Sequence, residues 1–362
     1  MEKHIAVMGV GAIGSTIGAY LTRAGRDLTL IDQWPEHVEV MKRSGIRVSA
    51  PDEDFTVRVR ALHLCETCNL QEKFDMAFLA VKSYDTLWAT HFIAPYLKPT
   101  GFVLPAQNGM NDEVVAGVVG FNRTVGCVIT FGAGVYDPGR VVRTEPVELD
   151  AFCIGELNGL VTPRAREVAE LLLPVGPNHM TTNIWGMRWS KMVINCMGNA
   201  LAGLIGPSGV DEAYQEVAGI VRMMAGGEVV RVAQAMGVSV EPVFGIEASR
   251  FAEATTKSAI RSLQETWKTA TSERNLSAEQ TRRIGQPGRP SLLQDVMKGR
   301  RPEADYLNGY VVRCGREVGV ATPVNEAIVD IMKQVERGEL KPAPSNLGRF
   351  EPLLRKARLL SR

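Results

Sequence analysis

The sequence predicts an α/β protein in two parts, an N-terminal parallel sheet covered by helices and an all-helical C-terminal domain. Up to about residue 180, short apolar runs alternate with helical segments, as is typical of a parallel sheet. From residue 185 onward, the apolar residues recur at helical spacing. This shift predicts domains at residues 1–180 and 181–340, followed by a C-terminal tail at residues 341–362.

A glycine-rich turn after the first strand indicates the type of sheet domain. The apolar residues 5–8 lead into Gly-x-Gly-x-x-Gly at residues 9–14, and residues 15–24 are predicted to form a helix. In such a turn Gly9 allows a tight reversal, Gly11 leaves room for a pyrophosphate and Gly14 lets the helix pack closely. The alternative is a βαβ turn that binds nothing. We expect a Rossmann dinucleotide-binding domain, whose phosphates face the helix N-terminus at Gly9, Gly11, Ala12, Ile13 and Gly14.

The predicted second strand, residues 28–31, indicates which dinucleotide binds. It ends at Asp32, 18 residues after Gly14, where Rossmann domains place the carboxylate that holds the adenosine ribose. A carboxylate accepts hydrogen bonds from a 2′-hydroxyl and repels a 2′-phosphate. We therefore expect NAD(H) to be preferred over NADP(H).

Polar residues follow the next two predicted strands. The continuous apolar run at residues 74–81 is typical of a strand buried on both faces, and Lys82 follows it. Residues 101–105 form another strand, and Asn108 lies just beyond it. Ligands of parallel sheets bind at such strand ends, although both residues fit an ordinary loop equally well.

In the helical part, the predicted helix at residues 185–204 carries a polar face. Lys191, Asn195 and Asn199 are spaced i, i+4, i+8 on an otherwise apolar helix. Buried without partners they would be costly, and the alternative is an exposed polar stripe. A lysine that gives a proton to a carbonyl oxygen, beside amides that orient a polar substrate, suits carbonyl reduction.

A second polar cluster follows further along the chain. It begins at Ser291, and Pro302 is suited to start the next helix, which places Glu303 in its first turn. An acidic residue there complements the helix dipole, so its charge alone does not distinguish a structural from a catalytic role.

Composition excludes several classes of partner. Of 362 residues, 45% are hydrophobic and 22% charged, and the net charge is +1, so nothing suggests nucleic acid as a partner. No signal peptide is visible and no apolar run reaches the roughly 18 residues needed to span a bilayer. We expect a soluble, cytoplasmic protein with a small-molecule substrate and no membrane partner. The oligomeric state stays open, a homodimer included.

Two further segments are described by their composition. Cys65 and Cys68 form the chain's one C-x-x-C pair; no second pair completes a zinc site, so we expect a surface stretch between strands and no metal. The polar residues 266–290 predict a mobile loop or lid. The proline-containing tail is expected to be loosely attached.

In combination, these motifs resemble those of the ketopantoate reductase (2-dehydropantoate 2-reductase) family, within the 6-phosphogluconate dehydrogenase-like superfamily. The resemblance covers most of the chain. It implies an NAD(P)-dependent oxidoreductase with its active site in a cleft between a Rossmann domain and a helical domain. It implies that Lys191 is the general acid assisted by Glu303, and that Lys82 and Asn108 lie near the cofactor. The residues that it implies for substrate binding are Asn195, Asn199 and Ser291.

The sequence departs from the family pattern in three places. Asp32 stands where NADPH-dependent members usually carry a basic residue. Gly209 and Gly288 stand where the bacterial reductase has substrate-contacting asparagines, and residues 266–290 form a longer segment than in compact members. Three hypotheses follow: a reductase of 2-oxo acids, ketopantoate included; an NAD-dependent dehydrogenase of the same fold that acts on a bulkier hydroxy compound; and a nucleotide sensor without catalysis.

Overall fold

The computed structural model describes residues 3–272, 276–285 and 288–360. The chain divides into two compact units. The N-terminal unit comprises the residues up to Ile184 and, from much later in the chain, Leu276–Gly288. The helical unit comprises residues 185–275 and those from Arg289 onward.

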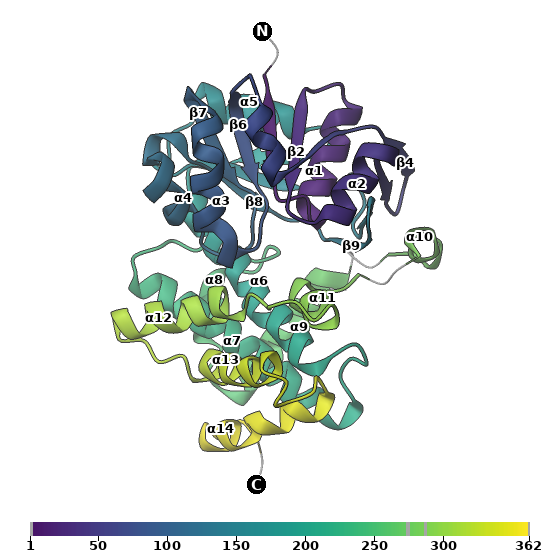
Figure 1. The fold of residues 1–362 in the computed structure, drawn as a ribbon. Helices are drawn as coiled ribbons and strands as arrows, with labels where there is room; N and C mark the ends of the chain where they lie inside the picture. Colours follow the sequence, from purple (N-terminus) through teal and green to yellow (C-terminus); the bar gives the residue numbers. More distant parts are fainter. Residues whose placement is uncertain (1–2, 273–275, 286–287, 361–362) are drawn as a thin grey trace. The chain divides into compact units, whose positions relative to one another are not determined.

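A five-stranded sheet forms the centre of the N-terminal unit, in the order β5-β2-β1-β6-β7 (Figure 1). All neighbouring pairs in it are parallel, and β1 lies in the middle, with Ile5 in register with Leu28 on one side and Met76 on the other. The chain builds outward from β1 through β2 to β5, then returns to β6 and β7. The carboxyl ends of β1 and β6 therefore form the switch point at which such sheets bind ligands. The strands are β1 (Ile5–Met8), β2 (Leu28–Asp32), β5 (Arg60–His63), β6 (Phe74–Leu79) and β7 (Leu97–Pro105).

Alternate residues of β1 supply two separate hydrophobic cores. Ile5 and Val7 pack in one core, which contains Ile17 of α1, whereas Ala6 and Met8 pack in the other, which contains Ile93 of α3. A strand buried on both faces reads as a continuous apolar run, as the sequence showed. The helices of this unit are α1 (Ala12–Arg23), α2 (Pro35–Ser44), α3 (Thr86–Ile93), α4 (Asp112–Val119) and α5 (Pro163–Leu172).

Two smaller sheets complete the N-terminal unit, in the orders β4-β3-β10-β9 and β12-β11-β8. From the sequence, residues 46–50 and 55–62 are predicted to be the two strands of a hairpin, and the single strand at residues 55–62 is wrong. It is two strands, β4, which pairs with β3, and β5, which joins the central sheet. The strands are β3 (Ile46–Ser49), β4 (Asp54–Val57), β8 (Val125–Ile129), β9 (Ala133–Asp137), β10 (Arg140–Arg143), β11 (Phe152–Glu156) and β12 (Asn178–Met180). Short 3₁₀ helices are η1 (Leu64–Asn69), η2 (Ser83–Asp85), η3 (Ala94–Tyr96) and η4 (Phe121–Arg123).

The described part of the second unit is built from helices (Figure 1). The predicted α/β fold with a helical C-terminal part is therefore confirmed. The helical spacing of apolar residues at 242–265 predicts one helix, but the structure has two there, α8 and α9. The elements are α6 (Ile184–Ile205), η5 (Glu212–Tyr214), α7 (Gln215–Ala235), α8 (Ala248–Glu253), α9 (Lys257–Ser272), α11 (Ser291–Met297), η6 (Ala304–Tyr306), α12 (Asn308–Val318), α13 (Pro323–Glu336), η7 (Pro344–Phe350) and α14 (Glu351–Lys356).

The segment expected to be an irregular loop, residues 266–290, contains helix where it is described. Helix α9 continues to Ser272, and α10 (Ala278–Ile284) follows a capping box in which the Ser277 hydroxyl accepts from the Gln280 amide. Ile284 is fully buried, and the Gln280 side chain donates to Asp52 at 3.2 Å. These contacts explain why α10 belongs to the N-terminal unit, whereas α9 belongs to the helical unit. Residues 273–275 and 286–287 lie outside the described part of the chain.

The C-terminal tail packs into the helical unit. Leu347, Phe350 and Leu354 are fully buried, and the Asn346 amide donates to the Leu204 carbonyl at the end of α6. The expectation of a loosely attached tail is wrong, because its apolar residues recur at helical spacing and complete the core of this unit. No helix in the described part of the chain is long and apolar enough to cross a membrane.

Candidate active site

The glycine turn between β1 and α1 has the geometry of a phosphate-binding turn. Gly9 has a φ of 88°, and a Cβ there would lie 2.7 Å from the Val81 amide nitrogen. A Cβ on Gly14 would lie 2.0 Å from the Gly9 carbonyl oxygen. A Cβ on Gly11, by contrast, would meet no atom of this chain within 4 Å. The turn is therefore closed toward the sheet and open over Gly11.

The first turn of α1 leaves its N-terminus available to an anion. Gly11 is the N-cap and provides no side-chain cap, and no acidic residue lies in the first turn. The first amides of a helix have no acceptor within it, and they carry the positive end of the helix dipole. The amides of residues 12–14 therefore suit the pyrophosphate of a dinucleotide.

Asp32 lies at the end of β2, as predicted, and its carboxylate is held by two backbone amides. One oxygen accepts from Val10 in the glycine turn, and the other accepts from Trp34 at 2.7 Å. Each carboxylate oxygen can accept a further hydrogen bond. Asp32 is thus fixed beside the turn with capacity left for two ribose hydroxyls, so the residues of this unit fit a dinucleotide.

The loops that carry Lys82 and Asn108 are tied together after β6 and β7. The Gln107 amide donates to the Val81 carbonyl at 2.8 Å and to the Thr86 hydroxyl at 2.9 Å. The Asn111 amide donates to the Asn108 carbonyl at 2.7 Å. Lys82 and Asn108 are themselves half-buried. The structure therefore brings these two loops together at the carboxyl edge of the sheet.

These positioning residues were missed by the sequence analysis. Gln107, Asn111 and Thr86 are buried, and they connect one loop to the other through side-chain amides and hydroxyls. The available signal was a run of polar residues directly after a buried strand. The three side chains hydrogen-bond to one another in series inside the protein, from Gln107 to Thr86 and from Thr86 to Asn111.

In the helical unit, the polar face of α6 is not an exposed stripe. Asn195 is buried, and Lys191 and Asn199 are half-buried on a helix whose other faces carry buried side chains such as Trp189 and Met192. The Asn199 amide donates to the Asn195 side-chain oxygen at 2.9 Å. The Asn199 oxygen in turn accepts from the Ser291 backbone amide at 3.1 Å. The three predicted substrate-binding residues therefore form one hydrogen-bonded line, which begins one turn after Lys191.

Glu303 does not lie in the first turn of a long helix, as Pro302 had suggested. Helix α12 begins at Asn308, and Glu303 only precedes the short helix η6, which its side chain does not cap. The Glu303 side chain is buried all the same. Glu303 is thus a buried carboxylate at the start of a short 3₁₀ helix and not in the first turn of a long α-helix.

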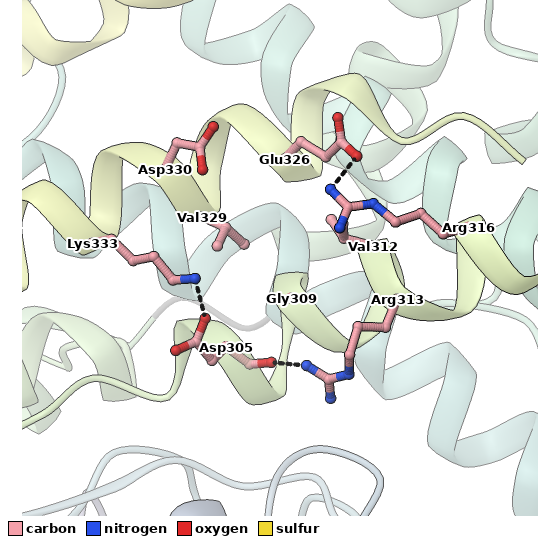
Figure 2. Close-up of a pocket in the computed structure, with 9 residues that line it drawn as sticks. All are labelled: Asp305, Gly309, Val312, Arg313, Arg316, Glu326, Val329, Asp330 and Lys333. Atoms are coloured by element: carbon pink, nitrogen blue, oxygen red, sulfur yellow. Dashed lines mark hydrogen bonds and ion pairs between the residues drawn. The ribbon is translucent and has the colours of Figure 1, made fainter.

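One surface pocket of the helical unit is separate from these residues. It has a volume of about 280 Å³ and lies between α12 and α13 (Figure 2). Ion pairs link Arg316 to Glu326 at 3.1 Å and Lys333 to Asp305 at 3.2 Å. None of the predicted site residues lines it, and two of its three cations, Arg316 and Lys333, are paired with carboxylates. Among the described residues, no group of three His, Cys, Asp or Glu side chains could hold a metal ion.

The fold and the glycine turn define the class of this protein as one with a Rossmann-type dinucleotide-binding domain. Family comparison then identifies the particular group. Residues 5–159 match the family described as ketopantoate reductase PanE/ApbA, and residues 183–336 match its C-terminal counterpart. The chain belongs to the ketopantoate reductase family, which confirms the predicted resemblance.

Individual relatives support the same assignment. A 2-dehydropantoate 2-reductase of Archaeoglobus fulgidus is 29% identical over 339 residues, which cover 93% of this chain and 99% of the relative. The crystal structure of a PanE/ApbA family ketopantoate reductase from Ralstonia eutropha is 25% identical, with a TM-score of 0.70 over 93% of this chain and 99% of that one. D-mandelate dehydrogenase, solved with NADH and anilino(oxo)acetate, has the same fold at 21% identity, with a TM-score of 0.73 over 92% and 99%. The chain is thus a 2-dehydropantoate 2-reductase-like oxidoreductase.

Proposed function

We propose that this protein transfers a hydride between NAD(H) and a 2-oxo or 2-hydroxy acid, with Lys191 as the general acid of reduction and general base of oxidation. In the reductive direction, the nicotinamide gives a hydride to the carbonyl carbon and a proton is added to the oxygen. A 2-oxo acid, NADH and one proton become a 2-hydroxy acid and NAD⁺. The observation that carries the proposal is the polar line Asn195–Asn199–Ser291, one turn beyond Lys191 on an apolar helix.

Lys191 suits the proton transfer because of its chemistry and its place. An ammonium beside the carbonyl oxygen stabilises the alkoxide that develops as hydride reaches carbon. General acid–base assistance of this kind is typically worth about 10²–10⁴-fold in rate. Glu303, buried and not used as a helix cap, is proposed to assist Lys191. Asn195, Asn199 and Ser291 are proposed to orient the substrate, and Lys82 and Asn108 to contact the cofactor.

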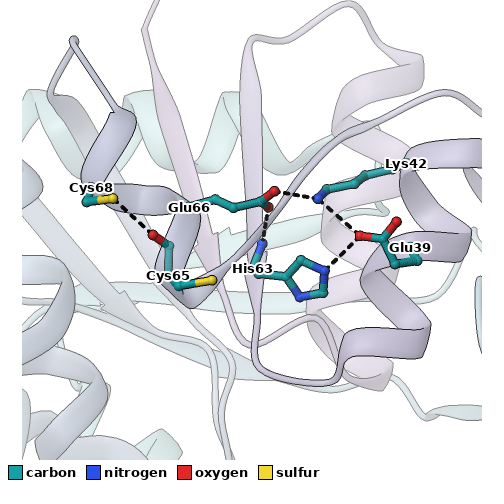
Figure 3. A network of polar contacts seen from close by, with 6 residues as sticks. All are labelled: Glu39, Lys42, His63, Cys65, Glu66 and Cys68. Carbon is teal, nitrogen blue, oxygen red and sulfur yellow. Dashed lines mark hydrogen bonds and ion pairs between the residues drawn. The ribbon is translucent and has the colours of Figure 1, made fainter.

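The preference for NAD(H) is supported by the charges around Asp32. In the sheet, Asp32 is in register with His63 of β5, whose ring nitrogen lies 2.8 Å from the Glu39 carboxylate (Figure 3). Lys42 is one candidate to bind a 2′-phosphate, but it is paired with Glu39 at 3.2 Å and Glu66 at 2.7 Å. Hydrogen bonds from the His63 side chain and Lys42 lower the pKa of the Glu39 carboxyl, and hydrogen bonds from Lys42 and the His63 backbone amide lower that of Glu66. Both therefore stay ionised at neutral pH and repel a 2′-phosphate.

The other candidate for a 2′-phosphate is occupied as well. Arg47 lies on β3, in a different sheet from Asp32, and forms an ion pair with Asp54 at 2.9 Å. Releasing that guanidinium would break two hydrogen bonds to the Asp54 carboxylate. Neither basic residue thus offers an NADP-specific contact without losing its partner.

A second candidate substrate is a hydroxy compound bulkier than pantoate. Gly209 has a φ of 77°, and a Cβ there would meet nothing within 4 Å, so the position presents only backbone. Gly288 likewise lacks an amide side chain. Each lost hydrogen bond to a charged substrate group would cost about 1.5–3 kcal/mol. The similarity to D-mandelate dehydrogenase, solved with anilino(oxo)acetate, supports a larger substrate.

The test is a substrate panel followed by nicotinamide absorbance with NADH and NADPH separately. Ketopantoate, a branched aliphatic 2-oxo acid, an aromatic 2-oxo acid and the corresponding hydroxy acids make up the panel. We expect weak turnover of ketopantoate and higher kcat/KM for a bulkier 2-oxo acid. Efficient reduction of ketopantoate would instead show that the substrate is the one in the names of the relatives, 2-dehydropantoate. No turnover of any compound with either cofactor would contradict the proposed activity.

A further inference from the structure

The C-x-x-C pair lies in a surface turn and is not used by the dinucleotide or polar sites described above. All six cysteines lie in the described part of the chain, and only Cys65 and Cys68 are exposed. The other four are buried in the two units. Any reagent that reacts with thiols from solvent will therefore reach this pair first.

The two cysteines are three residues apart in η1 (Leu64–Asn69), a 3₁₀ helix. In such a helix, side chains three residues apart eclipse and a rise of about 2.0 Å per residue separates their Cα atoms by roughly 6 Å. A disulfide needs Cα atoms about 4.4–6.8 Å apart. The backbone of the turn is thus already within disulfide range.

The two thiols point in different directions from the turn (Figure 3). The Cys68 sulfur donates to the Cys65 carbonyl at 3.0 Å, so it already lies against the backbone of its partner. Figure 3 shows the Cys65 sulfur pointing away from Cys68. Because Cys65 is exposed, its side chain can rotate toward Cys68 without displacing core residues.

The turn is held in this shape by contacts on both sides of the pair. The Glu66 carboxylate, between the two cysteines, accepts from the His63 amide at 2.7 Å and from the Lys42 ammonium at 2.7 Å (Figure 3). The Thr67 hydroxyl donates to the Leu64 carbonyl at 2.7 Å. A fixed turn keeps the second thiol close to the first, which favours an internal disulfide over two separate adducts.

We propose that Cys65 and Cys68 form a reversible disulfide by exchange with a low-molecular-weight disulfide such as oxidised glutathione. The outward Cys65 thiolate attacks one glutathione sulfur, which forms a mixed disulfide and releases one glutathione. The Cys68 thiolate then attacks the Cys65 sulfur and releases the second glutathione. Two protein thiols lose two electrons and two protons, and two glutathione thiols form. Reduced glutathione reverses both steps.

The experiment equilibrates the folded, full-length protein in buffers of varied ratio of oxidised to reduced glutathione, followed by acid quench, alkylation and mass spectrometry. We expect one population to lose two alkylatable thiols and about 2 Da, located in the tryptic peptide of residues 61–73. Excess reduced glutathione should restore both thiols. Accumulation of glutathione adducts on the wild type, or two free thiols across the whole series, would overturn the proposal.

Single variants separate pairing from mere exposure. Cys65→Ser and Cys68→Ser each leave one exposed thiol without its partner, so both should accumulate a glutathione adduct and show no two-hydrogen loss. Thermal melts should match the wild type because both side chains are exposed. Loss of two thiols in either single variant would show that another cysteine is the partner. This site does not depend on the proposed enzymatic activity.

Discussion

Asp32 illustrates how one residue serves both the fold and the proposed specificity. Its two carboxylate oxygens accept hydrogen bonds from the backbone amides of Val10 and Trp34, so Asp32 fixes the glycine turn to the end of β2. A sequence shows the spacing of a carboxylate from a glycine motif, but it does not show this second role. Substitutions at Asp32 will therefore affect cofactor affinity in general as well as cofactor choice.

A pair of variants separates those two effects. Asp32→Ala removes the carboxylate and should lower kcat/KM for NADH and for NADPH, because the glycine turn loses its support. The loss should be smaller for NADPH, because the repulsion between the carboxylate and the 2′-phosphate is also removed. Asp32→Arg adds a cation and should narrow or reverse the preference for NADH, measured as the ratio of kcat/KM values. Arg47→Ala is the matched control and should leave the ratio unchanged. A wild-type enzyme with higher kcat/KM for NADPH would contradict the assigned role of Asp32.

Glu228 is a buried carboxyl in α7 that the sequence did not single out. It accepts from the backbone amides of Val324 and Asn325, in the first turn of α13, both at 2.9 Å. Burial raises the pKa of Glu228 to about 7, although these hydrogen bonds and Arg231 act in the opposite direction. In the unfolded chain this carboxyl has a pKa near 4.5 and therefore releases its proton at lower pH than in the folded protein.

The sign of the pH dependence follows from that difference. Between about pH 4.5 and pH 7 the folded state holds more protons, so the free energy of unfolding falls as pH rises. The Glu228 contribution lost across this window is on the order of 3 kcal/mol. Glu228→Gln should remove it, as measured by urea unfolding at pH 5 and pH 7.5. Glu216→Gln, on an exposed face of the same helix, is the control. If the difference in free energy of unfolding between the wild type and Glu228→Gln is the same at both pH values, the raised pKa of Glu228 is refuted.

At the scale of elements, the βα turn is the part that the sequence predicts best. Gly9 is required by its φ of 88°, and Gly14 is required because an added Cβ would lie 2.0 Å from the Gly9 carbonyl oxygen, so both identities follow from the turn itself. The i, i+4, i+8 face of α6 was equally predictable from helix periodicity. The hydrogen bonds of Gln107 between the loops after β6 and β7 were not predictable, because only the folded sheet brings these two segments together.

The elements that were predicted wrongly depend on long-range pairing. Residues 55–62 read as one strand, and only pairing to β3 and to β2 shows that they are two. Pro302 suggested a helix start, yet Asn308 begins α12 and donates to the Cys196 carbonyl of α6. Local propensity gave way in both places to tertiary contacts.

Two alanine variants test the phosphate turn. Gly14→Ala places a Cβ 2.0 Å from the Gly9 carbonyl oxygen, so it should destabilise the protein by about 1–3 kcal/mol or more and lower its melting temperature. Gly11→Ala meets no atom within 4 Å and should melt like the wild type while its Kd for NADH rises. Calorimetry and NADH fluorescence titration measure the two effects. An unchanged Kd in Gly11→Ala would show that the pyrophosphate does not lie over this residue.

At the scale of the whole molecule, family membership and substrate are determined by different residues. The matched regions, residues 5–159 and 183–336, contain the sheet, the glycine turn and the polar face of α6. These features account for a nicotinamide-dependent oxidoreductase. The proposed preference for a bulkier substrate rests on fewer positions, Gly209 and Gly288, where this chain departs from the family pattern.

The measurement that tests the account most directly is kcat and NADH Kd on one preparation of Lys191→Ala. We expect kcat to fall by about 10²–10⁴-fold, because the proton donor to the substrate oxygen is lost. The Kd should stay near the wild-type value, since the glycine turn and Asp32 are unchanged. Lys333→Ala, a surface lysine paired with Asp305, is the control and should retain both values. A nearly unchanged kcat in Lys191→Ala would contradict the account and make Lys191 a structural cation of α6.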